Sequence, residues 1–401
     1  MAISFVNGSA AESIPVRDDR RVRVLLTSTP LDGHVRPMLP LAHELRRRGH
    51  ELAVATHESF HEHVANEGYA ALAAGTSHAD ASRGLEPFQA ELDAMPPLAR
   101  REHIYPRLFG RGHAPPKLDG LLRVCADWRP DVLVFESSDI AAPVVSAALG
   151  IPAVNHSFGA MIPLAALRRT EDAVLPLWRS VGLEPPPYAG AFDGLYVDIC
   201  PPSLAWEQPP GKHIRLAPAA PGAGSAPAWL EALGRPLVYV TLGTVFNEPE
   251  LLRRLLAALD DVPAALVTTG RDVDPAALGP APAHVRVEPF VPQADVLPSC
   301  AAVVAHGGSG STLAALAHGL PLVIVPRGAD QFENAARVES AGAAVVVMPP
   351  DVDSDTVGAA IRRVLDEPSF ADAARRIAAE IASMPGPAEV AVAVEEHAAA
   401  R

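Results

Sequence analysis

The stretch from His306 to Thr312, with the sequence His-Gly-Gly-Ser-Gly-Ser-Thr, constrains the fold of this chain more than any other feature. It follows a short apolar run and precedes a helix-like run that begins at Leu313, so it predicts a strand, a glycine loop and a helix. Glycines let a backbone approach a ligand, and the first N–H groups of a helix lack partners within it. The loop therefore predicts a phosphate-binding turn in an α/β domain; a tight turn without a ligand is the alternative.

This loop argues against two common phosphate chemistries. It lacks the lysine of a Walker A sequence, and it does not keep the G-x-G-x-x-G spacing of dinucleotide-binding turns. Hydrolysis of nucleoside triphosphates and dinucleotide redox chemistry are therefore poorly supported.

A second predicted strand end lies close by in the sequence. The run from Pro321 to Pro326 reads as a buried strand, and the segment from Arg327 to Asn334 follows it with Asp330 and Gln331 at the start of a helix. Ligands of open α/β sheets bind outside the carboxyl ends of the strands, so a diphosphate cradle and a hydroxyl-binding pair are expected side by side. That combination suits a sugar diphosphate. The alternative is a plain N-cap at Asp330 and a solvated first-turn residue at Gln331.

Composition narrows the function classes. The chain has 401 residues, of which 49% are apolar and 20% charged, and this balance predicts a globular protein with two cores. The formal charge of −14 argues against nucleic acid or an anionic membrane as the main partner. Three scattered cysteines form no C-x-x-C pair, and no stretch approaches the length of a membrane span, so we expect a cytoplasmic protein without stable membrane insertion.

Strand and helix patterns alternate in both halves of the chain, which predicts two doubly wound parallel sheets. The expected strands of the first half are 22–28, 52–56, 131–135 and 151–154, and those of the second half are 237–242, 265–269, 285–290, 301–305, 322–325 and 343–347. The stretch 60–116 is less regular and is either a variable substrate wall or a surface excursion with its own small core.

These patterns predict five parts of the chain. We expect a flexible tail over residues 1–21, an N-terminal Rossmann-like domain over 22–205 and a Pro- and Gly-rich linker over 206–228. A C-terminal Rossmann-like domain over 229–384 follows, and the last part, 385–401, is expected to form a helix that crosses back to the first domain.

An acid-base pair is expected at the carboxyl ends of two strands in the first half. The first strand-to-helix loop carries His34, and histidine is the side chain best matched to proton abstraction near neutral pH. A later strand delivers Glu136, with Asp139 one helical turn further on. Either carboxylate is suited to orient the imidazole; Glu136 is the first choice because Asp139 equally fits an N-cap. A purely structural role is the alternative for His34.

The segment from His57 to His61 matches H-E-x-x-H, the pattern of a zinc protease helix. We reject this interpretation because the match begins where a predicted strand ends and has no downstream third ligand. A polar cluster at the strand end, or part of an acceptor mouth, is expected instead.

The chain resembles a known family, the GT-B glycosyltransferases that attach sugars to small lipophilic molecules. It is most similar to the bacterial branch acting on antibiotics such as macrolides, enediynes and aromatic polyketides. The resemblance spans Val22 to about Glu395. Its most specific part runs from Pro-Phe-Val-Pro-Gln at 289–293 through Asp-Gln-Phe-Glu-Asn at 330–334, and Gly-His-Val-Arg-Pro at 33–37 adds support.

The resemblance implies a role for each matching residue. His34 would be the base that deprotonates the acceptor hydroxyl, oriented by Glu136 or Asp139; the family more often has Asp there. Phe290 would stack on the nucleobase where the family commonly has Trp, Val291 would contact the base through its backbone, and Gln293 would reach the ribose. Asp330 and Gln331 would hold the sugar hydroxyls. The residues implied to hold the diphosphate are Thr244, His306, Gly308, Ser309, Gly310 and Ser311, and Gly243 is expected to bind the donor as well.

The reaction that the resemblance implies is an inverting, metal-independent glycosyl transfer without a cofactor, from a TDP-sugar or UDP-sugar to a small lipophilic acceptor. The resemblance also implies that the N-terminal domain over 22–205 binds the acceptor and that the C-terminal domain over 229–384 binds the nucleotide sugar. A thymidine diphosphate deoxysugar is the expected donor. A sugar-nucleotide epimerase of the same fold, or a non-catalytic sugar-nucleotide-binding partner protein, is the alternative. The oligomeric state stays open, with a homodimer among the options.

Overall fold

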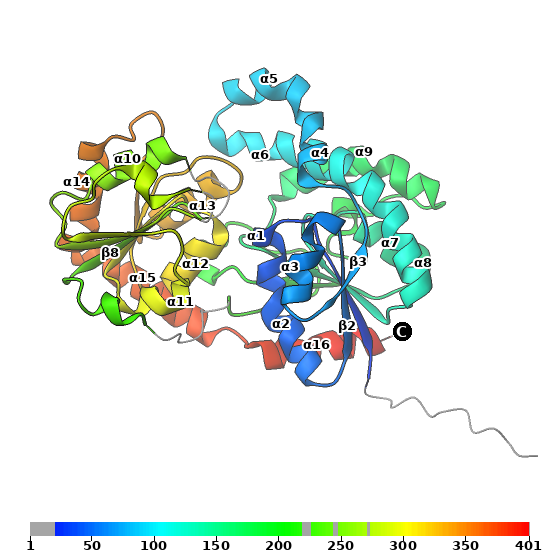
Figure 1. The fold of residues 1–401 in the computed structure, drawn as a ribbon. Helices are drawn as coiled ribbons and strands as arrows, with labels where there is room; N and C mark the ends of the chain where they lie inside the picture. The colour runs from blue at the N-terminus through cyan, green and yellow to red at the C-terminus, as the bar shows by residue number, and fades with distance from the viewer. Residues whose placement is uncertain (1–20, 219–225, 244–247, 271–272, 401) are drawn as a thin grey trace, which may run out of the picture.

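A computed structural model describes residues 21–218, 226–243, 248–270 and 273–400. They form two parallel β-sheets of seven and six strands, each flanked by helices, as the two halves of Figure 1 show. The expected pair of doubly wound, Rossmann-like domains, which is the GT-B architecture, is therefore confirmed.

The first sheet has the strand order β3-β2-β1-β4-β5-β6-β7, with all neighbours parallel. The order reverses between β1 and β4, and in open α/β sheets such a switch point opens a crevice for ligands. Every residue of β4 is buried, as expected for a strand covered on both faces. The strands are β1 (Arg23–Thr27), β2 (Glu51–Thr56), β3 (Ala70–Ala73), β4 (Val132–Glu136), β5 (Ala153–His156), β6 (Leu195–Asp198) and β7 (His213–Arg215).

The second sheet repeats this arrangement with the order β10-β9-β8-β11-β12-β13, and its switch point lies between β8 and β11. Strands β8, β9 and β11 are buried along their whole length. The strands are β8 (Leu237–Thr241), β9 (Ala264–Thr268), β10 (Val285–Glu288), β11 (Ala302–Ala305), β12 (Leu322–Ile324) and β13 (Ala344–Val346).

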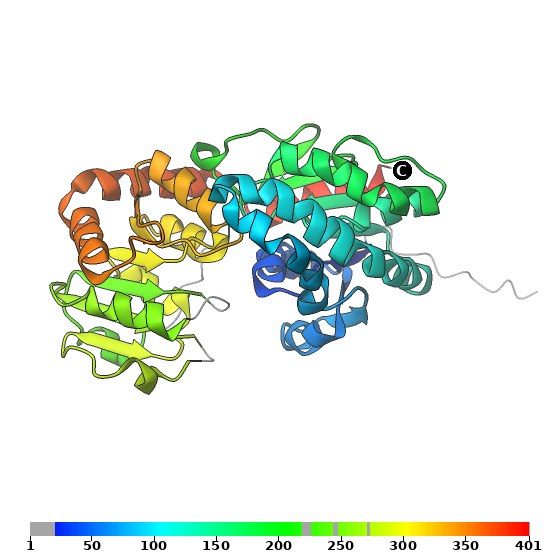
Figure 2. The same cartoon turned by 90° about the horizontal axis from the view of Figure 1, so that it is seen from above.

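Helices cover both faces of the sheets in both halves (Figures 1 and 2). The first half contains α1 (Asp32–Val35), α2 (Leu39–Arg47), α3 (His61–Asn66), α4 (His78–Ser82), α5 (Gln89–Ala94), α6 (Pro97–Tyr105), the π-helical segment η4 (Pro106–His113), α7 (Ala114–Trp128), α8 (Ala142–Leu149) and α9 (Leu164–Ser180). The second half contains α10 (Pro249–Ala257), α11 (Gln293–Val296), α12 (Ser309–Ala317), α13 (Gln331–Ser340), α14 (Ser354–Asp366), α15 (Pro368–Ser383) and α16 (Pro387–Ala399). Short 3-10 turns are η1 (Arg36–Met38), η2 (Glu58–Phe60), η3 (Arg83–Phe88), η5 (Pro187–Gly190), η6 (Pro202–Leu204), η7 (Ala228–Leu230), η8 (Pro275–Leu278) and η9 (Leu297–Ser299).

Two segments differ from the sequence prediction. The stretch 60–116 is more regular than expected, because it contains β3 and the helices α3 to α6, whose short length gives little periodic signal. The segment 206–228 is not only a linker, because β7 lies within it and forms the edge of the first sheet by pairing with β6. Three residues between proline- and glycine-rich flanks are too few to reveal a strand by alternation.

The last helix, α16, runs back under the first half and lies beside α2 (Figure 1). Glu395 of α16 accepts hydrogen bonds from the Arg48 guanidinium at 2.6 and 2.7 Å, and it lies 2.6 Å from Nε2 of His50. Val390, Ala391 and Val394 are fully buried in the core that covers this face of the first sheet. The last helix therefore packs against the first half of the chain.

Within the described ranges, no single helix is long and apolar enough to cross a bilayer. The pair α15 and α16 reaches the required length and composition only when both are counted across their 46° bend.

Candidate active site

His34 and Glu136 meet at the switch point of the first sheet. The loop after β1 leads into α1, which carries His34, and Glu136 is the last residue of the neighbouring strand β4. Nδ1 of His34 lies 3.1 Å from Oε2 of Glu136. The Glu136 side chain is fully buried and that of His34 is 13% exposed, so the imidazole is accessible in part while its carboxylate partner is not.

The carboxylate of Glu136 is held on both oxygens. Thr29 donates to Oε1 from its backbone N–H at 3.2 Å and from its hydroxyl at 2.9 Å, and Ser138 donates to Oε2 from its backbone N–H at 2.7 Å. Burial raises the pKa of the Glu136 carboxyl, but His34 and these backbone donors outweigh burial and hold the pKa below its usual range. The carboxylate is therefore ionised at neutral pH and can orient an imidazole and stabilise its protonated form.

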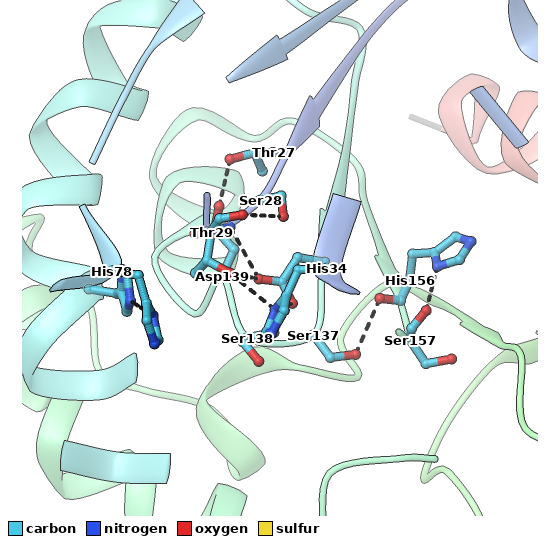
Figure 3. Close-up of polar contacts among 12 residues, drawn as sticks. Thr27, Ser28, Thr29, His34, His78, Ser137, Ser138, Asp139, His156 and Ser157 are labelled. Atoms are coloured by element: carbon cyan, nitrogen blue, oxygen red, sulfur yellow. Dashed lines mark hydrogen bonds and ion pairs between the residues drawn. The ribbon is translucent and has the colours of Figure 1, made fainter. Parts of the chain in front are cut away.

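The imidazole of His34 is also fixed by aromatic rings. Phe158 stacks on it with ring centroids 4.3 Å apart and an angle of 22° between the planes, and the ring of Phe109 lies 6.0 Å away. The hydroxyl of Thr29 lies 3.1 Å from Nδ1, on the same side as Glu136. Figure 3 shows Thr29 and His34 facing one another in this cluster. The contacts leave Nε2 as the ring nitrogen directed away from the carboxylate.

Asp139 occupies a different position from the one that a partner of His34 needs. Its Oδ2 accepts a hydrogen bond from the hydroxyl of Thr27 at 2.6 Å and lies 3.3 Å from Nζ of Lys117. Burial raises the pKa of Asp139, against the lowering effects of Lys117 and Thr27. Asp139 is not the N-cap of α8 either, since Ala141 takes that position. Of the two candidate acids, Glu136 is the one in contact with the imidazole.

A small pocket opens beside this cluster, between the loops that follow β1, β3 and β4 and the start of α7. Its wall includes Thr29, Thr76, His113, Lys117 and Asp139. Burial lowers the pKa of His113 to about 3, so this histidine is neutral at pH 7.

The second part of the candidate site is the glycine loop after β11, at the switch point of the second sheet. His306 follows β11, Gly308 is the N-cap of α12, and Gly243 follows the neighbouring strand β8. A Cβ at Gly243 or at Gly308 would lie 2.7 or 2.5 Å from the imidazole of His306, so a larger residue at either position would displace this ring. Burial lowers the pKa of His306 to about 4, although Asp330 opposes the effect, and the ring is therefore neutral at pH 7.

Asp330 and the loop are joined through hydrogen bonds at the start of α12. Ser309 donates its hydroxyl proton to Oδ2 of Asp330 at 2.7 Å, and Nδ2 of Asn334 donates to the same oxygen at 2.8 Å. Asn334 also donates to the carbonyl of Gly307 at 2.9 Å. Asp330 occupies the N-cap position of α13, as the alternative interpretation expects, but its side chain makes no capping bond. Asp330 is instead fixed against the glycine loop.

Gln331 and Gln293 each support a neighbouring loop. Gln331 is only 2% exposed, and its side-chain oxygen accepts hydrogen bonds from the N–H groups of Arg327 at 2.7 Å and Gly328 at 3.1 Å, so it is not a solvated first-turn residue. Gln293, at the start of α11, donates to the hydroxyl of Ser311 at 3.1 Å. This bond connects the segment 289–293 to α12.

The remaining predicted donor residues occupy varied positions. Phe290 lies just beyond β10, which ends at Glu288, and its side chain is 47% exposed. Val291 is 6% exposed and packs in the core. Gly310 is exposed, and a Cβ added there would meet nothing within 4 Å. Thr244 lies outside the described residues.

The H-E-x-x-H segment does not lie on one helix. His57 is the N-cap of the 3-10 turn η2, where its ring nitrogen accepts from the N–H of Ser59, and His61 begins α3. The expected strand-end cluster is consistent with this arrangement, because Nε2 of His61 lies 3.3 Å from the carbonyl of Thr56 at the end of β2.

Sequence reasoning missed several residues that hold the site together. Thr29 and Ser138 lie within two residues of strand ends and carry the ordinary signal of a hydrogen-bonding side chain after a strand. Asn334 is within the motif that prompted the prediction of Asp330, but its link to the glycine loop depends on the fold. The contacts of Phe158 with His34 have no local signal, since the two residues are far apart in the sequence.

The chain matches known proteins along nearly all of its length. Two models of the erythromycin biosynthesis protein CIII-like family match it, the N-terminal domain over residues 43–243 and the C-terminal domain over residues 253–397. The chain is 34% identical over 388 residues to L-demethylnoviosyl transferase from Streptomyces niveus, covering 92% of this chain and 97% of that protein. It is 35% identical over 393 residues to elloramycin glycosyltransferase ElmGT from Streptomyces olivaceus, covering 92% and 96%.

Solved structures of similar shape belong to the same class. Spinosyn rhamnosyltransferase SpnG, solved with thymidine diphosphate and also with spinosyn aglycone, superposes in both complexes with a TM-score of 0.77 and 26% identity. Each superposition covers 93% of this chain and 100% of that one. The chain therefore belongs to the erythromycin biosynthesis protein CIII-like family, and it is a natural-product glycosyltransferase with the GT-B fold.

Proposed function

We propose that the protein transfers a deoxysugar from a TDP-sugar to a hydroxyl group of a small lipophilic natural product, with inversion at the anomeric carbon and without a metal. The observation that carries this proposal is the contact of 3.1 Å between His34 and the buried carboxylate of Glu136 at the first switch point. This pair lies on the same side of the molecule as the glycine loop, because Phe158 stacks on His34 and the next residue, Gly159, packs on Ser309.

His34 acts as the general base in this proposal. Nδ1 faces Glu136, so Nε2 takes the proton of the acceptor hydroxyl while that oxygen attacks the anomeric carbon. The bond between this carbon and the diphosphate oxygen breaks on the opposite face, and TDP leaves. A single displacement of this kind inverts the anomeric centre. The proton on Nε2 then passes to solvent.

The glycine loop stabilises the leaving group. Negative charge grows on the diphosphate as its bond to the sugar breaks, and the N–H groups at the start of α12 and the positive end of its dipole are suited to meet that charge. His306 is neutral at pH 7, so it contributes a hydrogen bond and no net charge. These donors supply charge stabilisation without a metal. Asp330 and Gln331, held beside the loop, are suited to the sugar hydroxyls.

The similar proteins support this choice of substrates. SpnG binds thymidine diphosphate in one solved structure and spinosyn aglycone in another, and ElmGT is named an elloramycin glycosyltransferase. A TDP-sugar is therefore the preferred donor for this chain, with a UDP-sugar as the alternative. The relatives are named transferases, so neither the epimerase nor the non-catalytic partner gains support from them.

The test begins with calorimetric titration of TDP and UDP into protein treated with EDTA. We expect tighter binding of TDP, with no gain when magnesium is added. Transfer is then measured with TDP-rhamnose and a panel of macrolide and aromatic polyketide aglycones, and the anomeric configuration of the product is read by NMR. His34→Ala is expected to lower turnover by about 10²-fold to 10⁴-fold while TDP affinity is kept.

The matched control is His213→Ala, which removes an exposed histidine from the edge strand β7 and is expected to leave turnover unchanged. Near-wild-type turnover by His34→Ala would remove His34 from the mechanism. A product with retained configuration, or transfer that requires magnesium, would overturn the corresponding part of the proposal.

A further inference from the structure

Two adjacent residues, Phe158 and Gly159, connect His34, the proposed base, to the glycine loop after β11. Phe158 stacks on the imidazole of His34 at 4.3 Å. Gly159, which is buried, lies against Ser309, the first residue of α12. A Cβ built at Gly159 would lie 2.0 Å from Oγ of Ser309 and 2.7 Å from its Cβ, far closer than atoms can approach. The two domains therefore meet at a point where only glycine fits.

The segment before these residues is anchored to the first sheet. Ser157 directly follows β5, its N–H donates to the carbonyl of Val197 at 2.9 Å, and its hydroxyl accepts from the N–H of Ile199 at 2.8 Å. Figure 3 shows Ser157 beside His156 at the end of this strand. Because two hydrogen bonds join Ser157 to Val197 and Ile199, Phe158 and Gly159 start from a fixed point and have little freedom to withdraw from the opposite domain.

Ser309 is anchored equally well in the second domain. Its hydroxyl donates to Asp330 at 2.7 Å and accepts from Asn334 at 3.1 Å. A rotation of the side chain would break these bonds, and it would not relieve the conflict with Cβ, whose position the helix backbone fixes. A larger residue at position 159 must therefore push the domains apart or displace its own loop.

We propose that Gly159 is a positioning residue that sets how closely the glycine loop approaches His34, and that Phe158 transmits this position to the imidazole. The roles of His34 and of the loop rest on the proposed function, but the contact itself does not. In this arrangement the absence of a side chain at 159 fixes the distance across which the acceptor oxygen must reach the anomeric carbon. Transfer rates respond steeply to such distances.

The first test compares Gly159→Ala with the wild-type protein by small-angle X-ray scattering, without ligand. We expect a larger radius of gyration for the variant. Its affinity for TDP, measured by calorimetry, should be nearly unchanged, because the glycine loop lies entirely in the second domain. Gly84→Ala is the matched control, since a Cβ at Gly84 meets nothing within 4 Å. It is expected to leave both values unchanged.

Rescue distinguishes a steric conflict from a general defect. Ser309→Gly removes both atoms that the added Cβ would meet. We expect the double variant Gly159→Ala with Ser309→Gly to have the radius of gyration of Ser309→Gly alone. If Gly159→Ala alone does not fold but the double variant does, the conflict is equally demonstrated. If neither folds, Gly159 serves its own loop and the inference is wrong.

A spectroscopic measurement tests the link to the base. The Cε1 proton of His34, assigned as the signal missing from His34→Ala, carries a ring-current shift from Phe158 that Phe158→Leu should remove. We expect Gly159→Ala to move the same signal and Gly84→Ala to leave it in place. Unchanged values of both the radius and this signal in Gly159→Ala would overturn the inference. Failure of the wild-type protein to bind TDP would count against the proposed function alone.

Discussion

Nζ of Lys117 lies 3.3 Å from Oδ2 of Asp139, and both side chains are buried, with exposed fractions of 6% and 2%. Lys117 also donates hydrogen bonds to the carbonyls of Ser28 at 3.0 Å and Ala55 at 2.9 Å. The Lys117 ammonium thus connects α7 to the ends of β1 and β2 through hydrogen bonds. The two acids near the end of β4 consequently divide their tasks: Asp139 balances a buried cation, while Glu136 contacts His34.

Glu136→Gln is expected to lower turnover by about 10²-fold to 10⁴-fold with little change in TDP affinity. The amide keeps the size of the side chain but removes the negative charge that orients and stabilises the imidazolium. Steady-state rates and TDP calorimetry on the same preparation check this expectation. A variant that transfers sugar as fast as the wild-type protein would show that the contact with His34 is not catalytic.

Asp139→Asn is expected to act mainly on stability. Removing one charge of a buried pair leaves the Lys117 ammonium uncompensated, at a cost of about 3–5 kcal/mol in the free energy of unfolding. Urea denaturation measures this loss, and turnover under conditions where the variant stays folded should fall far less than in Glu136→Gln. The reverse ranking of the two variants would assign the partner of His34 to Asp139.

Stability should fall in mild acid because of three buried histidines. Burial lowers the pKa of His113 to about 3 and those of His156 and His306 to about 4, whereas the unfolded chain titrates near 6.5. Between about pH 4 and pH 6.5 the unfolded chain binds more protons than the native protein. Each histidine therefore lowers the free energy of unfolding by up to about 1.4 kcal/mol for every pH unit by which the pH is lowered. Above this window all three are neutral in both states.

His156→Gln should reduce this slope when urea denaturation is compared at about pH 5 and about pH 7. The difference between variant and wild-type protein isolates one histidine from the buried acids Asp139 and Asp198, whose raised pKa values act in the opposite direction. Equal slopes in the two proteins would mean that His156 binds a proton in the native state as readily as in the unfolded one.

The strand-to-loop pattern of the sequence predicts where the candidate site lies, because an apolar run followed by glycine or a helix start is a local signal. Glu136 ends β4 and His306 directly follows β11, while His34 and Asp330 lie in the strand-to-helix connections after β1 and β12. The local sequence pattern does not distinguish Glu136 from Asp139 as the partner of His34. It depends on Lys117, which reaches Asp139 from α7 and is visible only once the helix is packed.

Other features lack any sequence signal for a different reason. Strand β3 is the alanine-rich run Ala70–Ala73, and its pairing with β2, not its composition, makes it a strand. The conflict between a Cβ at Gly159 and Ser309 joins residues of different domains. Such contacts arise from the relative position of two independently patterned sheets, and a period of 2 or 3.6 residues carries no information about them.

Glu395→Ala is expected to lower the free energy of unfolding by about 1 kcal/mol, because it removes the partner of both Arg48 and His50 where α16 meets α2. The Glu395 side chain is 27% exposed, so solvent screening keeps the effect modest. Glu396→Ala, which removes an exposed carboxylate from the same helix, is the control and should change little. Equal losses in the two variants would show that the ion pairs contribute nothing specific.

Arg101 of α6, which is partly buried, forms an ion pair with the buried Glu333 of α13. The pair joins a helix of the first half to the helix that begins at Gln331 in the second half. Arg101→Met keeps much of the apolar stem but leaves the Glu333 carboxylate, which is 7% exposed, without its cation. We expect a loss of about 3 kcal/mol in the free energy of unfolding, and recovery of most of it in the double variant Arg101→Met with Glu333→Gln. Urea denaturation of the wild-type protein, the two single variants Arg101→Met and Glu333→Gln, and the double variant completes a double-mutant cycle. Strictly additive losses would show that the two charges do not stabilise one another across the domain boundary.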